Sequence, residues 1–136
     1  MLYLASDAPL PLVPWDASAP AFHVAELDPA RRVVRARFSF PNVVYVGSHA
    51  GCGCGFQLGE YPDFVDEEAP AKRESLRRLA DYVDARLALG GQLQFFLCWD
   101  GEEDSPAEVQ RVVTTRELRG EAFWFLEGEA STFVAG

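Results

Sequence analysis

Residues 70–99 read PAKRESLRRLADYVDARLALGGQLQFFLCW, and this stretch decides the fold class. Its first two thirds carry an apolar stripe at helical spacing, made of Leu76, Leu79, Ala80, Val83 and Leu87. Pro70 suits the first helical turn, and Gly90-Gly91 suits the end of a helix. Glu74 and Arg78 form a favourable i,i+4 pair on the polar side. The spacing predicts one long amphipathic helix over about 70–89.

The last part of the same stretch has the pattern of a buried β-strand. Residues 92–99 alternate between two faces: Leu93, Phe95, Leu97 and Trp99 share one face, and Phe96 and Cys98 share the other. The strand therefore follows the helix directly, after two glycines.

Further strands are expected on both sides of the helix. Residues 21–27 and 32–40 suggest a hairpin with its turn at Asp28-Pro29, because Val34, Ala36, Phe38 and Phe40 alternate with polar residues. Residues 2–5 and 43–46 are short apolar strands, and 108–115 and 122–127 are two more. The tail from 131 to 136 adds a short edge strand. Residues 7–20 contain four prolines and form an irregular arm.

The order of these elements predicts an α+β protein. Several strands precede one long helix and more strands follow it, and short turns between strands favour antiparallel pairing. We expect one domain over 1–136, with a mostly antiparallel sheet of about six to eight strands and the 70–89 helix packed on one face.

The charge of the chain argues against two classes of partner. The formal net charge is −9, with 21 acidic and 12 basic residues, so the protein repels phosphate backbones and anionic lipids. The two basic clusters are interpreted as solvated faces: Arg31, Arg32, Arg35 and Arg37, and Lys72, Arg73, Arg77 and Arg78. We therefore expect neither nucleic-acid nor membrane binding.

The start of the sequence and the cysteine count favour a cytoplasmic protein. The first residues, MLYLASD, lack the basic region of a signal peptide and reach an aspartate at once. No stretch approaches 18 uninterrupted apolar residues. Three cysteines are an odd number, unlike a secreted disulfide framework. A reducing cytoplasm is the expected compartment.

Chemistry is concentrated at residues 51–55, Gly-Cys-Gly-Cys-Gly, two residues after His49. His49, Cys52 and Cys54 supply three soft ligands, and Cys98 at the end of another strand is a fourth, which would complete a tetrahedral zinc site. Alternatively, Cys52 or Cys54 is a redox or nucleophilic thiol with His49 as its base. The simplest interpretation is structural: small apolar cysteines in a tight glycine bend.

These observations leave two function classes open. The first is a non-catalytic module whose Cys-Gly loop is structural or binds a metal. The second is a thiol-dependent enzyme or redox protein that uses Cys52 or Cys54 with His49. Aromatic residues on both faces of the predicted strand 122–127, together with those of 92–99, make a symmetric homodimer the simplest partner.

Overall fold

A six-stranded sheet forms the centre of the molecule. The computed structural model describes residues 1–58, 67–120 and 123–136, in which the strand order is β2-β3-β1-β4-β6-β5. All neighbouring strands are antiparallel except β5 and β6, which are parallel. The strands are β1 Leu2–Ser6, β2 Phe22–Glu26, β3 Asn42–Ser48, β4 Leu93–Leu97, β5 Val112–Thr114 and β6 Ala130–Val134. The predicted α+β class with a mostly antiparallel sheet is confirmed.

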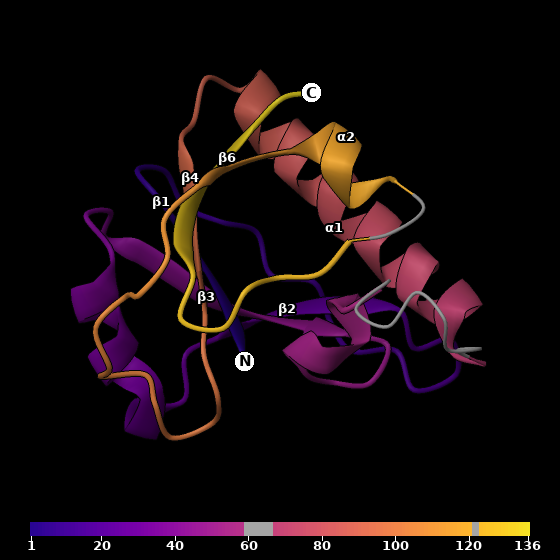
Figure 1. Cartoon of the computed structure of the whole chain (residues 1–136), viewed down its shortest axis with the longest axis horizontal. Helices are drawn as coiled ribbons and strands as arrows, with labels where there is room; N and C mark the ends of the chain where they lie inside the picture. The colour runs from indigo at the N-terminus through magenta and orange to yellow at the C-terminus, as the bar shows by residue number, and fades with distance from the viewer. Residues whose placement is uncertain (59–66, 121–122) are drawn as a thin grey trace.

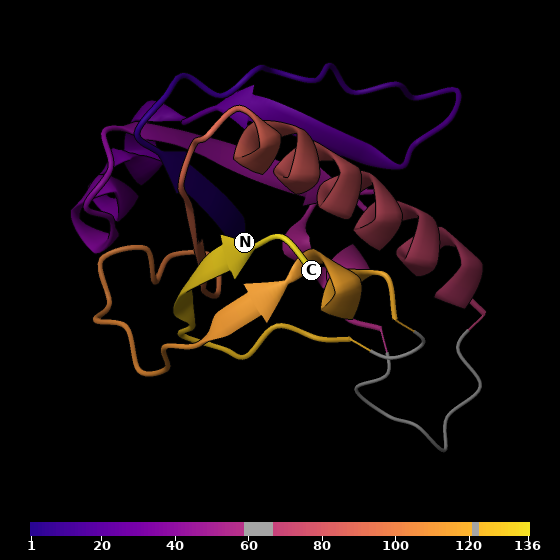
Figure 2. The same ribbon diagram turned by 90° about the horizontal axis from the view of Figure 1, so that it is seen from above.

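Helical segments cover both faces of this sheet (Figures 1 and 2). The long helix α1, Ala69–Ala88, packs on one face together with the short segment η2, Gly53–Phe56. The opposite face is partly covered by η1, Pro29–Arg37, a 3-10 helix. Because side chains alternate along each strand, β1 sends Leu2 and Leu4 to the first face and Tyr3 and Ala5 to the second.

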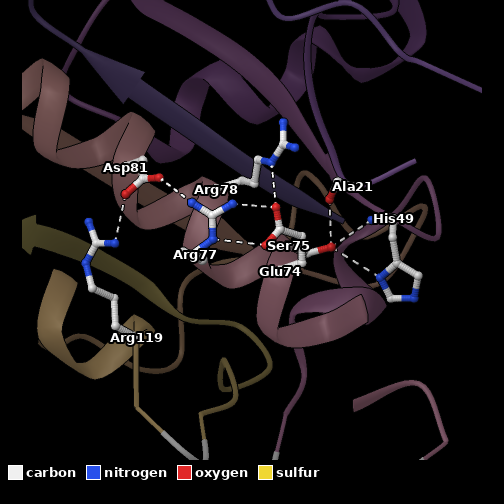
Figure 3. Close-up of polar contacts among 8 residues, drawn as sticks. All are labelled: Ala21, His49, Glu74, Ser75, Arg77, Arg78, Asp81 and Arg119. Carbon is white, nitrogen blue, oxygen red and sulfur yellow. Dashed lines mark hydrogen bonds and ion pairs between the residues drawn. The ribbon is translucent and has the colours of Figure 1, made fainter. Parts of the chain in front are cut away.

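The helix α1 agrees with its prediction at both ends. Its buried stripe holds the predicted Leu76, Leu79, Ala80 and Val83, and Gly90 just beyond its end has a φ of +82°. Glu74 accepts hydrogen bonds from Arg77 and Arg78, which lower the pKa of its carboxyl to about 2 (Figure 3). The pair predicted for Glu74 and Arg78 is therefore present, at 2.9 Å.

The predicted hairpin of 21–27 and 32–40 is wrong. The strand β2 pairs with β3, and residues 29–37 form η1. Asp28 accepts a hydrogen bond from the backbone nitrogen of Ala30 and begins the helix. In η1 the side chains of Arg31, Val34 and Arg37 are the less exposed ones, which is the three-residue period of a 3-10 helix.

Three predictions for the C-terminal third also need correction. The strand expected at 108–115 is only β5, because Thr114 and Glu117 form a capping box that begins the helix α2, Thr115–Leu118. Residues 121–122 lie outside the described part, and the rest of 122–127 makes a single bridge, between Phe123 and Leu58, instead of a strand. The tail does form a strand, β6, but between β4 and β5 instead of at an edge.

The arm of residues 7–20 is irregular, as predicted, apart from one bridge between Val13 and Val24. Trp15 from this arm lies edge-on to His23 of β2, with 5.1 Å between ring centroids. No helix in residues 1–58, 67–120 and 123–136 has the length and hydropathy that a membrane crossing requires.

Candidate functional site

The Gly-Cys-Gly-Cys-Gly loop follows β3 and is held by hydrogen bonds to its backbone. The carbonyl of Cys52 accepts from both the backbone nitrogen and the Oγ of Ser48, at 3.1 and 2.6 Å. The hydroxyl of Tyr45 donates to the carbonyl of Gly51 at 2.6 Å. Gly51 has a φ of +80°, a conformation that favours glycine. The path of the loop is therefore set by groups other than the cysteine sulfurs.

Cys52 and Cys54 form a disulfide. Gly53 between them is buried: a Cβ built there would lie 3.3 Å from the backbone nitrogen of Leu2 and from a methyl carbon of Leu97. Cys52 is half-buried, whereas Cys54 is exposed. The middle of the loop thus packs against β1 and β4, and Cys54 faces solvent.

His49 is fixed by a serine from the second turn of α1 (Figure 3). The Oγ of Ser75 lies 3.0 Å from the backbone nitrogen of His49 and 3.2 Å from its Nδ1. The same hydroxyl donates its proton to the carbonyl of Ala21, at 2.6 Å. Because that proton is already used, Nδ1 must be the donor in its contact with Ser75. The neutral ring therefore carries its hydrogen on Nδ1 and its lone pair on Nε2.

The Nε2 atom of His49 is buried and makes no hydrogen bond within the part of the chain that the structure describes. It lies 3.8 Å from Oε1 of Glu68, at the start of α1. A protonated ring would face this carboxylate, and a neutral ring presents a free lone pair. The side chain thus has two features of a general base, one nitrogen held by an orienting partner and a lone pair on the other, but in this structure that lone pair is buried.

The histidine ring and the cysteine loop are in contact through Gly55. A Cβ built at Gly55 would lie 2.8 Å from Nδ1 of His49 and 2.0 Å from Oγ of Ser48. The ring therefore lies against the backbone of the residue that follows Cys54. The structure brings together three of the four predicted site residues, His49, Cys52 and Cys54, in one loop.

Cys98 does not join them. Its side chain is 5% exposed and belongs to the cluster on the sheet face opposite η2, with Tyr3 and Phe96. Burial, and then the carboxylate of Glu103, raise the pKa of this thiol to about 12. It therefore stays protonated at neutral pH.

The four-ligand zinc set expected from the sequence is not assembled in this structure. Two of its sulfurs are bonded to each other, and Cys98 lies on the other side of the sheet. Residues 1–58, 67–120 and 123–136 contain no group of three or more His, Cys, Asp or Glu side chains that could hold a metal ion.

The site residue that the sequence argument missed is Ser75. It is fully buried in α1, directly before Leu76. One signal was available: Ser75 stands four residues before Leu79, so it lies on the apolar side of the helix, where a hydroxyl needs a partner.

Comparison with known proteins leaves the family open. No family model, no curated protein and no solved structure matches the chain.

Proposed function

We propose that this protein carries out thiol–disulfide exchange, with the Cys52–Cys54 disulfide as its oxidised form and His49 as its base. The observation that supports the proposal most is the exposed position of Cys54, in a disulfide whose loop lies against an oriented histidine. Exposed disulfides are more easily reduced than buried structural ones. This is the second of the two function classes left open by the sequence.

The short loop that the Cys52–Cys54 disulfide closes argues against a mainly structural role for this bond. The stabilisation that a cross-link gives through chain entropy grows with the size of the loop it closes. For the three residues from Cys52 to Cys54 this amounts to only about 1.6 kcal/mol, against about 3 kcal/mol for a 15-residue loop. Ser48 and Tyr45 already hold the loop. A disulfide here adds little to stability, so its chemistry is the better explanation for it.

The proposed reaction is a two-electron exchange with a dithiol of a substrate protein. A substrate thiolate attacks the Sγ of Cys54, the bond between the two loop sulfurs breaks, and Cys52 leaves as a thiolate. The second substrate thiolate then attacks the first substrate sulfur and releases Cys54 as a thiolate. The substrate dithiol becomes a disulfide, and the two loop thiolates take up the two protons that the substrate thiols lost, one through His49 and one through solvent, so that the loop becomes a dithiol.

His49 has the role of proton carrier in this exchange. In the proposal its Nε2 takes the proton of the attacking substrate thiol and returns it to the Cys52 thiolate. Because Nε2 is buried in the oxidised protein, the exchange requires the loop or the ring to move and expose this atom. Ser75 keeps Nδ1 protonated, so that the lone pair stays on Nε2. Cys98 takes no part, because its thiol is buried and its pKa is raised.

The test is a redox titration of the folded protein in glutathione buffers, with thiols counted by alkylation. We expect Cys52 and Cys54 to titrate together with a potential less negative than about −300 mV, the range below which structural disulfides lie. The matched control is Cys98→Ser, which should titrate like the original chain. His49→Gln should slow the exchange and leave the potential of the pair similar.

A disulfide that resists reduction in the folded protein would contradict the proposal and support the non-catalytic module. Metal analysis of the reduced protein tests the zinc alternative, since about one zinc per chain would favour a binding site. Gel filtration separately tests the expected homodimer.

A further inference from the structure

A groove lies on the sheet face opposite the disulfide, beside the C-terminal end of η1. Its volume is about 360 Å³, within the usual range of small-molecule sites. In Figure 1, η1 and the chain that leads into β5 lie on the side of the sheet away from α1. Its lining includes Arg37, Phe38, Gln110, Val112 and Thr132, together with Gln94 and Arg111.

The guanidinium of Arg37 lines this groove and has hydrogen-bond donors without a partner among the described residues. One guanidinium nitrogen, Nη1, donates to the carbonyl of Ser105 at 3.3 Å. The Nε is buried and has no hydrogen-bond partner. Within the described ranges, Arg37 makes no ion pair, although the chain has 21 acidic residues. The donors that an anion in the groove can reach are therefore those of the terminal nitrogens, Nη2 and the second hydrogen of Nη1, because Nε is buried.

The other cation in the groove is already neutralised. Arg111 makes two hydrogen bonds to the carboxylate of Glu129, which is fully buried, and a third to the carbonyl of Trp124. Gln94 is also occupied, because it accepts from the backbone nitrogen of Ser39 and donates to its hydroxyl. Positive charge in the groove is therefore concentrated at Arg37.

The remaining lining offers a short apolar wall and further polar groups. Val112 is 62% exposed and Phe38 is half-buried beside Arg37. The side chains of Thr132 and Gln110 make no hydrogen bond in the part of the chain that is described, so both can bind a ligand.

We propose that this groove binds a small molecule with a terminal oxyanion, carboxylate or phosphate, on a short apolar body. Arg37 binds the oxyanion through its two terminal nitrogens, whose planar arrangement of donors suits either group. Val112 and Phe38 contact the apolar body, and Thr132 and Gln110 add hydrogen bonds. The site is separate from the disulfide, and the proposal does not depend on thiol exchange.

The test uses three probes of similar shape and follows the backbone amides of Val112 and Thr132 by NMR. Benzoate and phenyl phosphate carry the two oxyanions, and benzamide is the neutral counterpart of benzoate. We expect saturable shifts with at least one anion, with a dissociation constant on the order of 1 mM, and about tenfold weaker binding of benzamide. Comparison of the two anions shows whether the groove prefers carboxylate or phosphate.

Substitutions test whether the guanidinium of Arg37 is the group that binds the anion. Arg37→Gln should weaken the anion about tenfold, whereas Arg32→Gln, an exposed arginine on the same helix that does not line this groove, should leave it unchanged. If Arg37→Gln does not fold, Val112→Glu decides, because this exposed position tolerates a charge and should repel the anion. Equal binding of benzamide and benzoate, no saturable shift, or unaltered binding in Val112→Glu would overturn the proposal.

Discussion

The hydroxyl of Ser75 lies 3.2 Å from Nδ1 of His49 and donates a hydrogen bond to the carbonyl of Ala21. Through this contact the second turn of α1 determines which nitrogen of the histidine carries hydrogen. The long helix therefore does more than cover the sheet: it positions the base beside the disulfide loop.

Replacing Ser75 with alanine should affect stability and exchange together. The change leaves the backbone nitrogen of His49 and the carbonyl of Ala21 without their partner, so the free energy of unfolding should fall by about 1–3 kcal/mol. The tautomer of the ring is no longer fixed, so thiol exchange should slow as well. Urea denaturation and the rate of disulfide reduction measure the two effects. Ser18→Ala, at an exposed position, should change neither.

Reduction of the Cys52–Cys54 bond should destabilise the protein only slightly. Closure of three residues contributes about 1.6 kcal/mol, and the hydrogen bonds from Ser48 and Tyr45 remain. Urea denaturation with and without reductant should therefore differ by less than about 2 kcal/mol. If the free energy of unfolding differed by about 4 kcal/mol, as is typical of structural disulfides, the bond would be a structural cross-link instead.

The substitutions Gly55→Ala and Gly53→Ala should lower the stability of the protein by different amounts. A Cβ at Gly55 would lie 2.0 Å from Oγ of Ser48 and 2.8 Å from Nδ1 of His49, so Gly55→Ala must displace the ring and should cost about 1–3 kcal/mol. At Gly53 the nearest atoms lie at 3.3 Å, and the cost should be smaller. Thermal denaturation gives the two values, and the imidazole NMR signals of His49 should move in the first variant only.

His23 should make the protein less stable below neutral pH. Burial lowers the pKa of its ring in the folded state, so the unfolded chain binds the proton more readily. The free energy of unfolding should therefore decrease as pH falls from about 6.5, the unfolded value, through the folded pKa. The difference in stability between His23→Gln and the original chain should change over this window. A constant difference between about pH 7 and pH 5 would contradict the assignment.

Glu129, which is fully buried, and Arg111, whose side chain is 33% exposed, form an ion pair whose disruption should be costly. Glu129 is fully buried and accepts two hydrogen bonds from Arg111, so Glu129→Gln leaves the guanidinium without its counter-charge. Because solvent reaches the side chain of Arg111, we expect a loss of about 1–3 kcal/mol in urea denaturation. Glu127→Gln, at an exposed position two residues earlier, should be neutral. Similar values for both variants would show that the pair contributes little.

The α+β class, the helix α1 and the irregular arm were predictable because they depend on local patterns. One apolar stripe with Pro70 before it and Gly90 after it is enough to predict α1. The strands β3 and β4 were likewise visible as apolar runs.

Elements whose partners are distant in the sequence were not predictable. The apolar residues of 32–40 fit the two-residue period of a strand. Arg31, Val34 and Arg37 fit the three-residue period of a 3-10 helix equally well, so packing against the rest of the protein decides between strand and helix. Ser75 bonds to residues 26 and 54 positions away. Whether Cys98 could reach Cys52 depended on which face of the sheet each occupies.

The central place of β1 has a consequence for synthesis in the cell. This strand is translated before both of its neighbours, pairs with β3 on one side, and obtains its other neighbour only when β4 is made. At about 5–20 residues per second the nascent chain waits several seconds between these events. Until β4 is made, one edge of this apolar strand lacks its backbone partner, and an unpaired apolar edge favours aggregation.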